Sequence, residues 1–222
     1  MLEDKRIIVT GSARGMGLAT LTAFVQAGAR VVGMDINDAD GEQAARDANA
    51  LGPGKATYLH IDIADKSSVE TAFQEAVNWL GGLDVLAHPA AIQAGSAASD
   101  VSVEHWDQMF AVNVRGTMIT NQAAYHHMKA AGGGSIINFG SISGQRAEPG
   151  AVAYSASKGA VHSWTRSAAG AWGMDRVRVN AILPAMATPM YQEAMALLTE
   201  QQATESFWMN HRSIALGQEY GD

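Results

Sequence analysis

Two residues with complementary acid–base chemistry stand four positions apart in the segment Tyr154-Ser155-Ala156-Ser157-Lys158. Positions four apart share one face of a helix, so Tyr154 and Lys158 can meet. A phenol titrates at about pH 10 and is a poor base at neutrality, but a nearby ammonium favours the phenolate and makes it more useful in acid–base catalysis. A single pair at this spacing far more often belongs to a solvated helix face, so its interpretation depends on the rest of the chain.

A glycine-rich segment, Thr10-Gly11-Ser12-Ala13-Arg14-Gly15-Met16-Gly17, follows the β-branched run Ile7-Ile8-Val9 and precedes a helical pattern from Leu18 to about Ala27. Its glycines let backbone N–H groups approach a pyrophosphate at the positive end of the helix. A second predicted strand, Arg30 to Met34, ends at Asp35, about 20 residues beyond the loop, where a carboxylate accepts hydrogen bonds from an adenosine ribose. This order of elements predicts a dinucleotide-binding unit.

The remaining chain alternates strands and helices without a linker or an internal repeat. We expect strands at 57–61, 83–87, 135–139 and 176–183, and helices at 67–80, 101–131 (two stretches that meet near Asn113) and 152–172. This alternation predicts an α/β fold in which a doubly wound, Rossmann-type parallel sheet forms the middle of three α/β/α layers in a single domain, 1–222. Ligands of such sheets bind beyond the carboxyl ends of the strands, where we expect Asp35, Asp62, Ser141 and Pro184.

Composition agrees with a single enzyme-sized domain. The chain has 222 residues, of which 47% are hydrophobic and 17% charged, enough for a sizeable core. Its net charge of −7 argues against nucleic acid as a partner, and no apolar run approaches the length of a membrane span. The absence of cysteine excludes disulfides and thiolate metal sites, and the histidines form no ligand pattern, so no metal is expected. The default expectation is a cytoplasmic protein.

Taken together, these motifs resemble the short-chain dehydrogenase/reductase family, in its compact single-domain form. The resemblance runs from about Lys5 to Pro189, and it rests on four features in the family's order: the Thr10–Gly17 cofactor loop, Asn113, Ser141, and Tyr154 with Lys158. It implies hydride transfer between a nicotinamide cofactor and a carbinol or carbonyl carbon.

The resemblance also implies residue roles. Tyr154 would exchange a proton with the substrate oxygen, and Ser141 would hydrogen-bond that oxygen. Lys158 would lower the Tyr154 pKa and hold the nicotinamide ribose. Asn113 would hold a water that links Lys158 to solvent, although a helix-kink residue that satisfies free backbone groups is a compatible reading. The cofactor-binding set would be Gly11, Arg14, Gly15, Met16, Gly17, Asp35, Asp62, Ile63, Ala90, Tyr154, Lys158, Pro184 and Thr188.

Cofactor choice turns on charge near the adenosine ribose. Asp35 repels the 2′-phosphate of NADP and suits the free hydroxyls of NAD, so we expect NAD. Arg14 could oppose this by reaching a phosphate, but a solvated or structural arginine is the plainer interpretation. Asp62 either contacts the adenine amino group, as in the family, or caps the next helix.

The chain departs from the family pattern in three places. The family's Asn-Asn-Ala-Gly is here His88-Pro89-Ala90-Ala91; proline removes a backbone donor and alanine cannot take glycine-only conformations, so cofactor affinity and strand anchoring are affected. A Pro-Gly pair is replaced by Pro184-Ala185. The family's last strand and helix have no counterpart before Asp222.

We therefore predict an NAD-dependent alcohol dehydrogenase or ketone reductase that forms a homo-oligomer, either a dimer or a tetramer. A catalytically weak, nucleotide-binding sensor or assembly subunit is the alternative, and an NAD-assisted epimerase or dehydratase a lesser one. By resemblance, residues 186–216 form a substrate lid, and their methionines and aromatics suit a bulky, apolar secondary alcohol or ketone. The residues concerned are Met190, Tyr191, Met195, Leu197, Leu198, Phe207, Trp208 and Met209.

Overall fold

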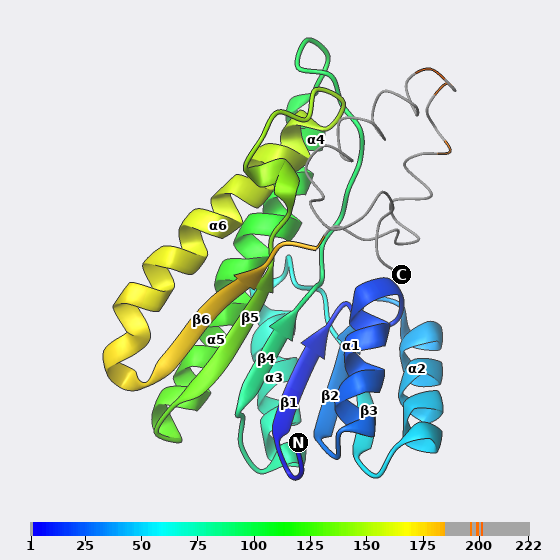
Figure 1. The fold of residues 1–222 in the computed structure, drawn as a ribbon, viewed down its shortest axis with the longest axis vertical. Coiled ribbons are helices and arrows are strands. Elements are labelled where there is room, and N and C mark those ends of the chain that lie inside the picture. The colour runs from blue at the N-terminus through cyan, green and yellow to red at the C-terminus, as the bar shows by residue number, and fades with distance from the viewer. Residues whose placement is uncertain (1, 185–195, 197–198, 200, 202–222) are drawn as a thin grey trace, which may run out of the picture.

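The fold is a parallel sheet covered by helices on both faces (Figure 1). The computed structural model describes residues 2–184, 196, 199 and 201. Within these residues the sheet order is β3-β2-β1-β4-β5-β6. The strands are β1 (Arg6–Thr10), β2 (Arg30–Asp35), β3 (Lys55–His60), β4 (Val85–His88), β5 (Gly134–Phe139) and β6 (Val177–Ile182).

The helices connect successive strands and form the two outer layers. They are α1 (Gly15–Gln26), α2 (Asp38–Leu51), α3 (Lys66–Leu80), α4 (Val103–Phe110), α5 (Gly116–Ala130) and α6 (Val152–Trp172). A π-helical turn, η1 (Ala111–Arg115), joins α4 to α5, and short 3₁₀ turns lie at η2 (Ile142–Gly144) and η3 (Gly173–Asp175). The predicted Rossmann-type α/β fold is confirmed.

Two hydrophobic clusters lie on opposite faces of the sheet. Alternate residues of β1 point to opposite sides, as the strand period of two requires. Ile8 joins the cluster beneath α3, α5 and α6, whereas Ile7 and Val9 join the cluster beneath α1 and α2. Strands buried on both faces read as continuous apolar runs, which is why β1 was recognisable in the sequence.

The carboxyl ends of the strands meet at one edge of the sheet. Thr10 at the end of β1 pairs with Met34 of β2, and His88 at the end of β4 pairs with Asn138 of β5. Phe139 in turn pairs with Ile182 at the end of β6. Parallel pairing therefore brings the loops after all these strands together, and the glycine loop after β1, Asp35 and Ser141 lie at these strand ends.

The sequence pattern missed one helix and placed others to within a few residues. Helix α2 was not predicted because its buried residues are the small Gly41, Ala44, Ala45 and Ala48, which give little hydrophobic periodicity. Helix α1 begins at Gly15 rather than Leu18, since two loop glycines lie in its first turn. Helix α6 has the predicted bounds, 152–172. Across the described part of the chain, no helix is both long and apolar enough to cross a membrane.

Candidate active site

Two glycines of the loop, Gly11 and Gly17, are packed so tightly that a larger residue would not fit at either position. Gly11 has φ +62°, and a Cβ there would lie 2.8 Å from Cα of Ala90. A Cβ on Gly17 would lie 1.9 Å from the carbonyl oxygen of Gly11. Helix α1 therefore sits directly against the loop, with its first N–H groups at the sheet edge. Its N-cap residue, Arg14, makes no side-chain capping bond, and the first turn contains no acidic residue, so an anion is well matched to this helix end.

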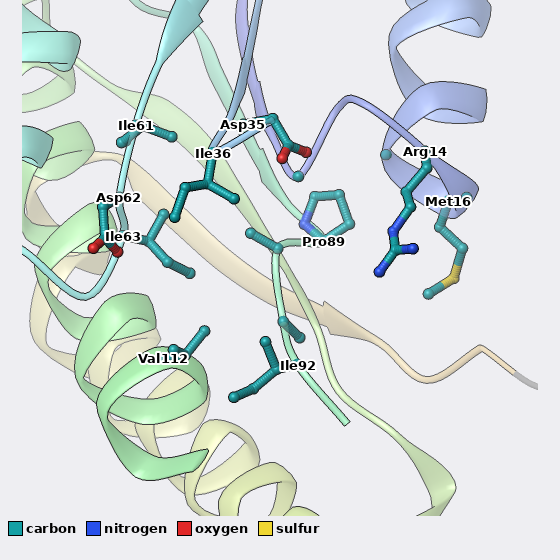
Figure 2. Close-up of a pocket in the computed structure, with 15 residues that line it drawn as sticks. Arg14, Met16, Asp35, Ile36, Ile61, Asp62, Ile63, Pro89, Ile92 and Val112 are labelled. Atoms are coloured by element: carbon teal, nitrogen blue, oxygen red, sulfur yellow. The ribbon is translucent and has the colours of Figure 1, made fainter. Parts of the chain in front are cut away.

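A cavity of about 270 Å³ opens beside this loop (Figure 2). Nine of the predicted cofactor-binding residues line it together: Gly11, Arg14, Gly15, Met16, Gly17, Asp35, Asp62, Ile63 and Ala90. Figure 2 shows Arg14 and Met16 on the α1 side, with Asp62 and Ile63 across the cavity and Pro89 between them. The sequence did not predict the other lining residues, Ile36, Ile61, Pro89, Ala91, Ile92 and Val112. These are mostly aliphatic, and in a sequence an aliphatic side chain next to a strand is indistinguishable from a residue of the hydrophobic core.

Asp35 is held in place by two backbone donors. Its Oδ2 accepts from the N–H of Ala13 at 3.0 Å, and its Oδ1 accepts from the N–H of Asn37 at 3.0 Å. Each carboxylate oxygen keeps a second lone pair. Asp35 thus ties the glycine loop to the end of β2 and still presents acceptors to the cavity.

Asp62 is not a helix cap. Helix α3 is capped by Asp65, whose side chain accepts from the N–H of Ser67. Asp62 Oδ1 instead accepts from the N–H of Ala64 at 2.9 Å, and its backbone N–H donates to Ser68 Oγ. This turn fixes the carboxylate at the cavity wall, so the capping alternative is wrong and the adenine alternative stays a prediction.

The segment 88–91 fits without backbone strain. Among the described non-glycine residues only Asp4 and Arg176 have positive φ, so Ala91 takes an ordinary conformation in place of the family's glycine. His88 is 2% exposed, and its Nδ1 lies 2.7 Å from Thr10 Oγ1 on the neighbouring strand. Burial, followed by the nearby Lys158 charge, lowers the His88 pKa to about 3, so the imidazole is neutral. The strand anchoring that the sequence left in question is supplied by this pair.

Asn113 joins three parts of the structure from the π-helical turn. Its Oδ1 accepts from Ile92 N–H, and its Nδ2 donates to Ile92 O, both at 2.9 Å. Nδ2 also lies 3.1 Å from Ser157 Oγ on α6. The side chain therefore pins the loop after β4 to α6, as expected for a kink residue that satisfies backbone groups. Its predicted water-holding role stays a prediction.

Ser141 and Tyr154 form a hydrogen-bonded pair. Ser141 lies two residues beyond the end of β5, and Tyr154 stands in the first turn of α6. Their side chains are hydrogen-bonded to each other. Ser141 Oγ also accepts from Ser143 N–H at 3.2 Å, which fixes the hydroxyl at the start of η2.

Lys158 is buried one helical turn after Tyr154. It is 4% exposed, and its Nζ donates to Phe139 O at 2.8 Å. The ammonium lies 5.6 Å from the centre of the Tyr154 ring. Burial lowers the Lys158 pKa to about 8. The predicted meeting of the pair on one helix face is therefore seen.

The Tyr154 pKa lies above its ordinary value, and the lowering expected from Lys158 stays a prediction. Burial raises the Tyr154 pKa above its ordinary value, and the hydrogen bond with Ser141 offsets part of that rise. Desolvation of the phenol raises its pKa, whereas a nearby ammonium lowers it, so the two act in opposite directions. The phenol is accordingly neutral at physiological pH and suited to donating a proton.

Some predicted site residues are not among those that line the cavity. Pro184 is two residues beyond β6 but does not line the cavity. Thr188 and nearly all of the predicted lid, 186–216, lie outside the described residues.

A parallel α/β sheet, a glycine-lined cavity at its carboxyl edge and a Ser-Tyr-Lys cluster at the same edge are the features of an oxidoreductase of the Rossmann type. The family model described as "short chain dehydrogenase" matches residues 5–197. The chain belongs to the short-chain dehydrogenase/reductase family.

Several of its relatives are named as dehydrogenases of alcohols or sugars. A probable galactose dehydrogenase of Rhizobium meliloti is 37% identical, over 98% of this chain and 80% of the relative. A cyclopentanol dehydrogenase of a Comamonas species is 37% identical, over 87% of this chain and 78% of the relative. A 2,5-dichloro-2,5-cyclohexadiene-1,4-diol dehydrogenase of Sphingobium indicum is 40% identical, with 87% and 77% covered.

Solved structures show the same fold. A short-chain type dehydrogenase/reductase from Mycobacterium ulcerans aligns with a TM-score of 0.87 at 27% identity, covering 94% of this chain and 76% of the other. A putative short-chain alcohol dehydrogenase from Sinorhizobium meliloti aligns with a TM-score of 0.87 at 28% identity, covering 99% and 84%.

Proposed function

We propose that this protein transfers a hydride between NAD(H) and a bulky, mostly apolar secondary alcohol or its ketone. The observation that carries the proposal is the Ser141–Tyr154 hydrogen bond, with the buried Lys158 one turn further along α6. These groups stand at the same sheet edge as the glycine-lined cavity, so a substrate oxygen and a cofactor can reach each other there.

Tyr154 is the proton donor in the reductive direction. Because its phenol is neutral, it can deliver a proton to the carbonyl oxygen as negative charge develops there. Ser141 donates a hydrogen bond to the same oxygen, and its own Oγ is already oriented by the Ser143 N–H. In the oxidative direction the same phenol oxygen, as phenolate, takes the proton back.

Lys158 assists this proton exchange by stabilising the phenolate form of Tyr154. A buried ammonium with a pKa of about 8 stabilises a phenolate nearby more strongly than a solvated one would. Its remaining N–H groups are available to a ribose hydroxyl, since Phe139 O accepts only one. Asn113 would hold the water that completes the proton path to solvent, and its side-chain bonds to Ile92 and to Ser157 fix it between the loop after β4 and α6.

The residues lining the cavity fit a dinucleotide. A Cβ on Gly15, which has φ +56°, would meet nothing within 4 Å, so this glycine faces open space. Gly11, Gly15 and Gly17 would hold the pyrophosphate, and Asp35 the adenosine ribose. When bound, the nicotinamide ring donates or accepts the hydride. Asp35 favours NAD over NADP because a carboxylate repels the additional phosphate.

The substrate class is supported by names and by composition. Two relatives are named for alicyclic alcohols, cyclopentanol and a chlorinated cyclohexadienediol. The segment after Thr188 contributes methionines and aromatic residues to this chain, and such side chains suit an adaptable apolar pocket.

The test is NADH formation, followed by absorbance, across a panel of alcohols. Cyclopentanol and cyclohexanol should outperform lactate and other short hydroxy acids, and NAD should outperform NADP. Galactose and sorbitol belong in the panel because relatives are named for them. Preferred turnover of a sugar or a hydroxy acid would refute the substrate class. NADH binding without turnover of any alcohol would support a nucleotide-binding sensor or assembly subunit instead.

A further inference from the structure

A histidine that the catalytic scheme does not use holds the backbone of the candidate serine. His162 lies on α6 one turn after Lys158, and it is 8% exposed. Its Nε2 accepts from the N–H of Ser141 at 3.2 Å. Tyr154, Lys158 and His162 are spaced four apart, so one face of α6 carries all three.

The imidazole occupies a space made by two glycines. A Cβ on Gly140 would lie 2.2 Å from His162 Nε2, and a Cβ on Gly144 would lie 2.9 Å from Cε1. These glycines flank the segment that carries Ser141. The His162 ring therefore packs closely enough against residues 140–144 to fix their position.

The hydrogen bond from Ser141 N–H to His162 Nε2 defines the tautomer of the imidazole and requires the ring to be neutral. Nε2 accepts a hydrogen bond, so in the neutral ring the proton is on Nδ1. An imidazolium has donors only, so protonation would remove the acceptor and set two N–H groups against each other. Burial, Lys158 and Arg166 all lower the His162 pKa, which keeps the ring neutral near pH 7.

The surroundings hold few other groups that could change this balance. Lys158 and Arg166 both belong to α6 itself. The facing segment, 140–144, contains only glycine, serine and isoleucine. On the adjacent β6, the charged residue is Arg178, which is exposed.

We propose that His162 is a positioning residue, which holds Ser141 in register with Tyr154 by accepting its backbone N–H. The inference rests on the proposed function, because it assumes that Ser141 acts on the substrate oxygen. If His162 holds Ser141 in this way, activity falls at acid pH as His162 gains a proton. The cause is then displacement of Ser141 relative to Tyr154 and not weaker binding of the cofactor.

Two variants separate the acceptor from the ring. His162→Phe keeps a ring of similar size but removes the acceptor, and it should lower kcat by about tenfold or more while the KM for NAD changes less than about twofold. His162→Gln places an amide oxygen near the position of Nε2, so it should retain most of the wild-type kcat and lose the acid fall in the pH profile. His126→Gln, at an exposed histidine of α5, is the control and should behave as wild type throughout.

A measurement without turnover makes the test independent of the proposed function. In ¹⁵N NMR spectra of the wild-type protein, the His162 ring should show the Nδ1–H tautomer, and the Ser141 amide should shift with the same midpoint as that ring. An Nε2–H tautomer, or an acid profile shared by His162→Gln and wild type, would overturn the proposal. Should His162→Phe fail to fold, the wild-type titration and the Gln variant still decide. If no alcohol is oxidised, the proposed function fails while the NMR result stands on its own.

Discussion

The candidate site has two halves, a backbone half and a side-chain half, and they are built on different physical principles. On the side of β1, β2 and β3, the cavity wall is shaped by backbone: glycines that exclude a Cβ, helix N–H groups, and an Asp35 carboxylate fixed by two backbone donors. On the side of β4, β5 and α6, the site is made from ionisable side chains buried in the protein, with Lys158 and His88 nearly inaccessible. The side-chain half carries charges and rings that water would solvate better, so desolvation disfavours their burial.

The largest expected effect belongs to the side-chain half. Replacing Tyr154 with Phe removes the proton donor, and kcat should fall about 10²–10⁴-fold, the usual contribution of a positioned general acid. Initial rates with NAD and the best alcohol of the panel measure it, and circular dichroism checks the fold. A correctly folded Tyr154→Phe enzyme with most of its activity would remove Tyr154 from the scheme.

Burial of Lys158 should make the same half a source of instability. Its pKa of about 8 lies below the 10.5 of an unfolded lysine, so the unfolded state binds more protons between these values and stability rises with pH across that window. At neutral pH the folded state is disfavoured by up to about 3 kcal/mol. Lys158→Met should therefore raise the unfolding free energy by roughly 1–3 kcal/mol after the loss of the Phe139 bond.

Urea titration at pH 7 and pH 10 measures this difference. The advantage of Lys158→Met should shrink at pH 10. The control, Lys66→Met, changes an exposed lysine paired with Glu70 and should be nearly neutral. A Lys158→Met protein less stable than wild type at pH 7 would show that the ammonium stabilises the fold.

Burial of His88 should make the folding stability fall at acid pH. Its folded pKa of about 3 lies below the unfolded value of 6.5, so the unfolded state binds more protons in that window and stability falls as the pH drops from 6.5 toward 3. At pH 5 the contribution is roughly 2 kcal/mol. His88→Asn should lose less stability than wild type between pH 7 and pH 5, and equal losses in the two proteins would contradict the neutral buried ring.

In the backbone half, the charge of Asp35 should determine the preference for NAD over NADP. Asp35→Asn keeps an oxygen for one of the two backbone donors but removes the repulsion toward a 2′-phosphate. The ratio of kcat/KM for NAD to that for NADP should fall by on the order of tenfold. Asp47→Asn, at an exposed position of α2, is the matched control. An unchanged ratio in Asp35→Asn would mean that Arg14 sets the preference.

Sequence reasoning worked better for the backbone half, and the reason is physical. Glycine positions, strand ends and an acid at the end of β2 are local signals, so nine cavity residues could be named in advance. The spacing of Tyr154 and Lys158 was equally local. The raised Tyr154 pKa, the Thr10–His88 pair and the Ser141–His162 contact depend on burial and on partners far along the chain. Helix α2 escaped notice because alanine and glycine bury without leaving a periodic pattern.

The central claim, that one half binds the cofactor and the other performs proton transfer, is tested most directly by the affinity of Tyr154→Phe for NADH. Fluorescence titration gives the dissociation constant in the same preparation used for turnover. At most one hydrogen bond to the cofactor is lost, worth about 0.5–1.5 kcal/mol, so affinity should change by less than about tenfold while kcat collapses. A loss of NADH affinity as large as the loss of kcat would contradict the division between the two halves.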